Sequence, residues 1–166
     1  MEKTYILSLS KINDNMVLKL PFSDFELPLT DDFRYIIDVV FLKHEFKTLI
    51  IDLNDLIFID EEGIASLIYA YNVAVKYNRT LIISSSKNYV KQMIHQKGLQ
   101  KIIEVQDTTG NAIKTANFYS LVEKKFRIDK KKLEEFFGIP FDRYAGLTLS
   151  LIKRFKEAIN QFTLAS

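Results

Sequence analysis

One stretch of the sequence decides the fold: Thr48-Leu-Ile-Ile-Asp-Leu-Asn-Asp-Leu-Ile-Phe-Ile-Asp-Glu-Glu-Gly-Ile-Ala-Ser66. Its first apolar run, Leu49 to Leu53, is rich in Ile and too short for a helix, which is typical of a buried strand. After the polar step Asn54-Asp55, a second apolar run leads to Asp60. Beyond this point apolar residues recur at spacings of three and four, which predicts an amphipathic helix. The residues expected on its buried face are Ile64, Leu67, Ile68, Tyr71 and Ala74.

Three consecutive acidic residues, Asp60, Glu61 and Glu62, occupy the junction between the second apolar run and the helix. Asp is favoured as a helix N-cap because its carboxylate accepts hydrogen bonds from free backbone N–H groups. Acidic side chains in the first turn also interact favourably with the positive end of the helix dipole. We therefore expect Asp60 to cap this helix and its two neighbours to stabilise the first turn.

The junction resembles the STAS domain family, which includes bacterial anti-sigma factor antagonists and the cytoplasmic domains of sulfate transporters. The family pattern is an apolar strand, an Asp, two residues that are often Ser or Thr, a Gly and an apolar helix. The matching residues here are Ile59, Asp60, Glu61, Glu62, Gly63 and Ile64. The resemblance covers roughly the first two thirds of the chain. It departs from the family at Glu61, which stands where phosphorylated antagonists carry the Ser or Thr that a partner kinase modifies.

The residues before the deciding stretch predict a hairpin and a helix. Two apolar runs, Tyr5 to Ser10 and Met16 to Leu20, flank a turn-rich Asn-Asp-Asn triplet. Two prolines bound Phe22 to Leu29, which favours a loop or an edge segment. Thr30 is the expected N-cap of the next helix. The residues that this helix is expected to bury are Phe33, Ile36, Ile37, Val40 and Phe41.

The residues after the stretch continue the alternation of strands and helices. Leu81 to Ser84 predicts a strand, and Ser86 is the expected cap of a helix over residues 87–97 that Gly98 ends. Lys101 to Val105 predicts the last strand, and a helix then begins at Thr108 or Thr109. This order predicts an α/β fold, a right-handed crossover sheet with helices packed on it. The STAS resemblance implies the same class, with a mixed sheet of about four or five strands. We expect this domain to span residues 1–123.

Residues 124–166 predict a separate helical extension. The last part of the chain carries an amphipathic stripe, which must be buried against something. The stripe consists of Leu147, Leu151, Ile152, Phe155, Ile159 and Phe162. The extension begins with a basic patch formed by Lys124, Lys125, Arg127, Lys130, Lys131 and Lys132. The helix at its end is a candidate for packing on its own domain, for pairing in a homodimer or for docking on a partner.

Composition restricts the class of protein. The chain has 166 residues, 48% of them hydrophobic and 27% charged, with a formal net charge of +2, which suits a globular domain with an appendage. Cysteine is absent, so disulfides and thiol catalysis are excluded. No apolar run approaches the ~20 residues that span a bilayer, and the first residues lack the pattern of a signal peptide. We therefore expect a cytoplasmic protein.

The sequence carries no signature of an enzyme. It has no Gly-rich phosphate loop, no spaced cluster of metal ligands and no nucleophile motif. The two histidines, His44 and His95, lie on separate predicted helices. The acidic triplet offers oxygens for a hard cation or for acid–base chemistry, but from the residues alone the favoured interpretation is a helix start stabilised by ~0.3–1 kcal/mol per acid. We expect no catalytic residue, no metal site and no cofactor.

The resemblance implies a regulatory protein-interaction module. In antagonists of this family the strand-to-helix turn meets an anti-sigma factor that is also a serine kinase, and phosphorylation releases the complex. The implied partner-binding residues here are Asp60, Glu61, Glu62, Gly63, Ile64 and Leu67, with part of the loop over residues 84–87. Because Glu61 has no hydroxyl, two hypotheses follow. Either the surface is locked in a phosphorylated-like state, or a different partner presents a basic patch to Glu61 and Glu62.

Two alternatives belong to other classes of function. The basic patch is the kind of segment that binds nucleic acid or an acidic membrane surface. Such binding would weaken steeply with added salt. The resemblance also allows an accessory subunit of a membrane transport complex.

Overall fold

The computed structural model describes residues 7–126, and the side chains of residues 7–121. The strands are β1 (Ser8–Ile12), β2 (Asn15–Lys19), β3 (Asp24–Phe25), β4 (Thr48–Asp52), β5 (Phe58–Ile59), β6 (Thr80–Ser84) and β7 (Glu104–Gln106). The helices are α1 (Leu29–Lys43), α2 (Glu61–Lys76), α3 (Asn88–Gln96), the 3-10 turn η1 (Leu99–Lys101) and α4 (Thr109–Phe126). Almost all of the predicted extension lies outside the described residues, so the proposed boundary at residue 123 stays a prediction.

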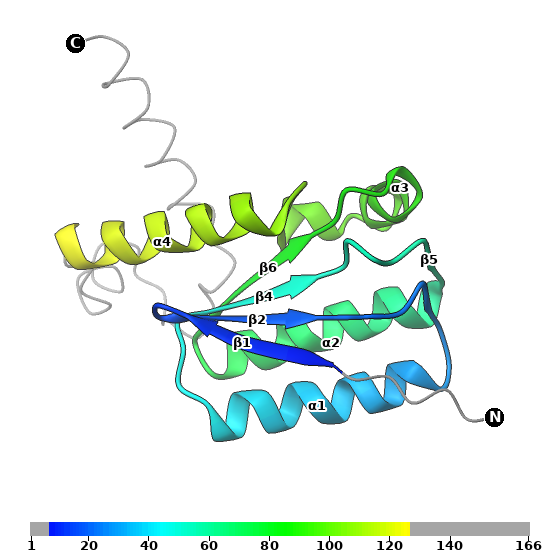
Figure 1. Cartoon of the computed structure of the whole chain (residues 1–166), viewed down its shortest axis with the longest axis horizontal. Helices are drawn as coiled ribbons and strands as arrows, with labels where there is room; N and C mark the ends of the chain where they lie inside the picture. The colour runs from blue at the N-terminus through cyan, green and yellow to red at the C-terminus, as the bar shows by residue number, and fades with distance from the viewer. Residues whose placement is uncertain (1–6, 127–166) are drawn as a thin grey trace, which may run out of the picture. The chain divides into compact units, whose positions relative to one another are not determined.

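The main sheet has the strand order β1-β2-β4-β6-β7 (Figure 1). The β1–β2 pair is antiparallel, and the other three pairs are parallel. Asn13 adopts a φ of 55° in the hairpin turn, a conformation that Asn tolerates better than most residues. The predicted mixed sheet of four or five strands with packed helices is therefore confirmed.

A small second sheet pairs β3 with β5 in parallel. The sequence indicated only a loop or edge segment for the stretch that contains β3. Two residues per strand are too few to produce a periodic pattern, so this pairing had no signal in the sequence. It matters because β5 leads directly into α2.

The two faces of the main sheet differ in chemistry because successive side chains of a strand point to opposite faces. Leu49 and Ile51 of β4 belong to the main apolar core, which α1 and α2 share (Figure 1). On the opposite face only one apolar row crosses the middle of the sheet, where Val17, Ile50 and Ile82 are buried and in register. Asn15 and Thr48 continue this face at one end of the row, and both are buried.

Hydrogen bonds join the first part of α4 to this more polar face. The Asn15 side-chain amide donates to Asn117 Oδ1 over 2.9 Å, and the Ser84 and Thr109 hydroxyls lie 2.9 Å apart. Ala112 and Ala116 of α4 are completely buried. The small side chains leave room for the close approach that these hydrogen bonds need.

Several element boundaries differ from the sequence-based expectations. The α1 helix begins at Leu29 after Pro28, so Thr30 lies inside its first turn, buried, and is not the N-cap. Lys87 precedes α3 without a side-chain cap, so the prediction for Ser86 was wrong. The last strand, expected from Lys101, begins at Glu104 instead, and Lys101 belongs to η1. Residue preferences within a short stretch do not predict where contacts with the rest of the fold end a helix or a strand.

The buried face of α2 also differs in part. Leu67 is 0% exposed as expected, whereas Ile68 is 36% exposed. We expect Leu67→Ala to lower the free energy of unfolding by about 2–5 kcal/mol, because it leaves a cavity in the core. Ile68→Ala is the matched control and should cost about 1 kcal/mol or less. Urea unfolding of both variants measures the difference. Equal losses would contradict the assignment of Leu67 to the core.

Candidate functional site

The turn between β5 and α2 is built around the N-cap of α2. Asp60 has an extended backbone, with φ −97° and ψ −173°, and its Oδ1 accepts a 2.7 Å hydrogen bond from the Gly63 amide. This is the geometry by which an Asp satisfies one of the free N–H groups of a helix start. The expected capping role of Asp60 is confirmed.

Gly63 is required by a close approach of two backbones. A Cβ built on this residue would lie 2.5 Å from the carbonyl oxygen of Phe25 and 2.6 Å from Cγ1 of Ile59. The same Phe25 carbonyl accepts a 3.4 Å hydrogen bond from the Asp60 amide. The β3 backbone therefore passes directly against the first turn of α2, and only a residue without a side chain fits there.

Glu61 extends from this turn into solvent, with 82% of its side chain exposed. Its Oε1 nevertheless accepts a 2.7 Å hydrogen bond from Lys97 Nζ. Lys97 follows α3, so two elements far apart in the sequence meet at the turn. The hydrogen bond and the charge of Lys97 lower the pKa of the Glu61 carboxyl below its ordinary value. Nothing in the sequence pattern indicated this partner.

Glu62 and Ser66 contact α1 through one arginine. Arg34 lies 3.5 Å from Glu62 Oε2, and its Nε donates a 3.1 Å hydrogen bond to Ser66 Oγ. The guanidinium of Arg34 also lies 5.8 Å from the centre of the Tyr69 ring. The Ser66 hydroxyl thus binds a neighbouring helix, and the residue is fully buried.

Two of the expected contact residues lie in the core. Ile64 is 4% exposed and Leu67 is 0% exposed, and both belong to the main apolar cluster. Their side chains pack into the core behind the turn and are not at the surface in this conformation. The exposed apolar side chains beside the turn are instead Ile57, Phe58 and Tyr89. The rings of Phe58 and Tyr89 stack with centroids 5.7 Å apart and planes 13° from parallel.

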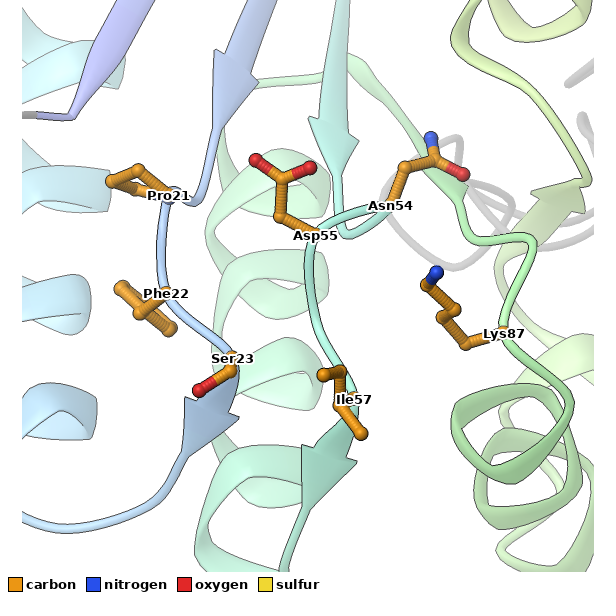
Figure 2. A pocket seen from close by; sticks show the side chains of 7 residues that line it. All are labelled: Pro21, Phe22, Ser23, Asn54, Asp55, Ile57 and Lys87. Atoms are coloured by element: carbon orange, nitrogen blue, oxygen red, sulfur yellow. The ribbon is translucent and has the colours of Figure 1, made fainter.

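An open cleft of about 580 Å³ lies at the carboxyl ends of β2 and β4. Figure 2 shows the side chains that line it: Pro21, Phe22, Ser23, Asn54, Asp55, Ile57 and Lys87. Lys87 comes from the loop over residues 84–87 that the sequence analysis included in the partner surface. Asp55 is paired with Lys19, whose Nζ lies 3.1 Å from Asp55 Oδ2, and this pairing raises the pKa of Lys19.

Asn54 fixes the loop that carries the cleft. Its side-chain amide nitrogen donates to Asp52 Oδ1 over 2.8 Å and to Ser84 Oγ and Thr109 Oγ1 over 3.2 Å each. These acceptors come from β4, β6 and the start of α4. The loop between β4 and β5 is therefore attached to the sheet and to α4 before the chain reaches Asp60.

The remaining features that the sequence analysis considered are the two histidines, a metal site, a membrane-spanning helix and the basic patch. Both histidines are exposed, and within residues 7–126 no three His, Cys, Asp or Glu side chains gather as ligands for a metal ion. None of the helices in this described part is long and apolar enough to cross a membrane. The side chains of Lys124 and Lys125 lie outside the described part of the chain. So do Arg127, Lys130, Lys131 and Lys132, and the basic patch stays a prediction.

We expect Gly63→Ala to lower the free energy of unfolding by about 3 kcal/mol, since the new methyl group would overlap a backbone oxygen that has little freedom to move. Gly110→Ala is the control, because a Cβ there meets only Thr108 Oγ1 at 3.9 Å. It should leave stability unchanged or raise it by up to ~1 kcal/mol. Chemical denaturation followed by circular dichroism measures both. A Gly63→Ala variant as stable as the wild type would contradict the close approach.

Comparison with known proteins agrees with this fold. The STAS domain family matches residues 29–112, about half of the chain. A comparison with curated protein sequences gave no match. Seventeen chains of solved structures match in fold. They include an anti-sigma factor antagonist from Mycobacterium paratuberculosis, with 17% identity and a TM-score of 0.61 over 68% of this chain and 93% of that one.

Two further structures extend the comparison. The anti-sigma factor antagonist SpoIIAA, in its unphosphorylated form, has 17% identity and a TM-score of 0.58, covering 68% of this chain and 96% of its own. A sulfate transporter family protein from Wolinella succinogenes has 16% identity and a TM-score of 0.58, covering 64% and 87%. At such identities the likeness concerns the fold alone. With the family match over residues 29–112, it leads to one conclusion: this chain belongs to the STAS domain family.

Proposed function

We propose that this protein is a non-enzymatic, anti-sigma factor antagonist-like regulatory module that binds a partner protein through the turn from Asp60 to Gly63. One observation carries the proposal. The turn is rigidly built, by the Asp60 cap and the close contact of Gly63, yet it leaves the Glu61 side chain 82% exposed. A fixed backbone that presents an exposed side chain suits recognition, because little conformational entropy is lost on binding.

The exposed apolar side chains beside the turn support the same surface. Protein interfaces combine a few aromatic or apolar anchors with a polar rim. Phe58 and Tyr89, together with Ile57, supply the anchors in this proposal, and Asp60, Glu61 and Glu62 supply the rim. Ile64 and Leu67 hold the turn in place from the core.

The proposed interaction is independent of phosphorylation at the position of Glu61. A carboxylate side chain has no hydroxyl to accept a phosphoryl group. The nearest hydroxyl further along α2, that of Ser66, is buried and bound to Arg34. Regulation therefore has to act through the amount of the protein, through its partner or through another part of the chain. A cytoplasmic bacterial role in control of transcription is part of the proposal.

Replacing Glu61 tests this surface. Glu61→Lys should reduce capture of the partner from lysate of the source cells at least about tenfold, since it places two cations side by side at the turn. Quantitative mass spectrometry of proteins bound to the full-length wild type and variant provides the measurement. Recovery of a kinase-like anti-sigma factor that depends on Glu61 would support the antagonist-like role.

Glu45→Lys is the matched control. It makes the same change of charge at an exposed residue just before β4, at the opposite edge of the sheet from the turn. Its capture profile should equal that of the wild type. Equal losses in both variants would indicate a general charge effect, and equal retention would mean that the turn is not the contact surface. Capture of membrane-transport subunits, or of nucleic acid that salt removes, would replace the proposed function.

A further inference from the structure

The negative charges of the acidic residues in the turn are balanced by neighbouring groups that the sequence pattern does not reveal. Asp60 is hydrogen-bonded to the Gly63 amide at the positive end of α2. Glu62 faces Arg34 over 3.5 Å, and Glu61 faces Lys97 over 2.7 Å. Each glutamate therefore has a cation from a different helix region beside it. The turn presents pairs of opposite charges to an approaching molecule.

The short distance between Glu61 and Lys97 has an electrostatic consequence. At physiological ionic strength the screening length is about 8 Å, several times the separation of the two charged groups. A partner approaching from solvent therefore meets a dipole with no net charge, whose field decays quickly. Exposed ion pairs of this kind add little to folding stability. The main effect of Lys97 is therefore to weaken the electrostatic field of Glu61 at the protein surface.

An exposed aromatic pair shares the α3 helix with this ion pair. Phe58 is two residues before the Asp60 cap, and Tyr89 lies on α3, the helix that Lys97 follows. Phe58 therefore stacks on Tyr89 at one end of α3, while Glu61 meets Lys97 at the other end. The α3 helix runs beside β5 and the start of α2, and the aromatic pair and the ion pair lie along one line of contact.

We propose that Lys97 is a specificity-determining residue of the partner surface: by neutralising Glu61 it selects a partner protein with uncharged, apolar side chains at this contact, and rejects one with a basic patch. This inference rests on the proposed function, because it concerns the same turn. A basic partner would have to displace Lys97 or share the Glu61 carboxylate with it, and in either case the cation of Lys97 repels the partner's own. An apolar partner that covers the ion pair leaves both charges paired with each other, which costs less free energy than covering one unpaired charge.

The first test uses the protein alone. In the full-length chain, NMR titration should show a lowered pKa for the Glu61 carboxyl, and Lys97→Gln should return that pKa towards its ordinary value. Lys91→Gln is the control, since Lys91 also belongs to α3 but pairs with Asp107 over 3.0 Å. An ordinary Glu61 pKa in the wild type, or the same lowered value in Lys97→Gln, would show that the pair does not form and would overturn the inference.

The second test measures affinity for the purified protein that the wild type captures and Glu61→Lys loses. Either single change, Glu61→Gln or Lys97→Gln, leaves one unpaired charge at the contact and should weaken binding about tenfold or more. The double variant Glu61→Gln/Lys97→Gln and the exchanged pair Glu61→Lys/Lys97→Glu restore neutrality. Both should bind within about threefold of the wild type.

The opposite pattern identifies a basic partner. If Glu61→Gln weakens binding while Lys97→Gln strengthens it, the partner uses the carboxylate directly and Lys97 competes with it, which overturns the inference but leaves the proposed function intact. Equal affinity in all four variants would show that charge at this contact does not affect binding. That result would also overturn the inference and leave the proposed function intact. If no captured protein depends on Glu61, the proposed function itself fails.

Discussion

The contact between Gly63 and the carbonyl oxygen of Phe25 constrains the rest of the candidate surface. A Cβ at residue 63 would lie 2.5 Å from that oxygen, so the backbones of β3 and α2 meet without any side chain between them. The short β3–β5 sheet depends on this approach, and β5 fixes where α2 begins. Asp60 then caps the helix in place, and Glu61 leaves the turn in a defined direction.

Around this fixed turn, three helices contribute to one balanced set of charges. Asp60 is satisfied within α2, Glu62 faces Arg34 from α1, and Glu61 faces Lys97 after α3. None of these exposed ion pairs holds the fold together, because water and salt screen most of their attraction. They determine instead what the surface shows to another molecule. That surface combines neutral ion pairs with a stacked aromatic pair, a composition closer to a protein interface than to a site for polyanions or cations.

Stability comes from elsewhere, mainly from the apolar face of the sheet beneath α1 and α2. The opposite face carries a single apolar row through Ile50 and uses hydrogen bonds to hold the first part of α4. Asn54 lies in the loop that leads from β4 towards the turn. Its side chain donates hydrogen bonds to Asp52 in β4, Ser84 in β6 and Thr109 at the start of α4. The scaffold and the candidate surface are therefore connected by a short polar network at the carboxyl edge of the sheet.

The sequence by itself determined the alternation of the main strands and helices and the Asp60 cap, and the family resemblance added the mixed sheet and the Gly at position 63. The alternation and the cap depend on local periodicity and on backbone chemistry within a few residues, whereas Gly63 is required by the backbone of Phe25, which is distant in the sequence. Only the tertiary structure decided that Ile64 and Leu67 face the core, that Phe58 stacks on Tyr89, and that Lys97 pairs with Glu61. Contacts across 36 residues of sequence, such as the one between Glu61 and Lys97, leave no periodic signal. They arise because packing α3 beside β5 brings the end of that helix to the turn.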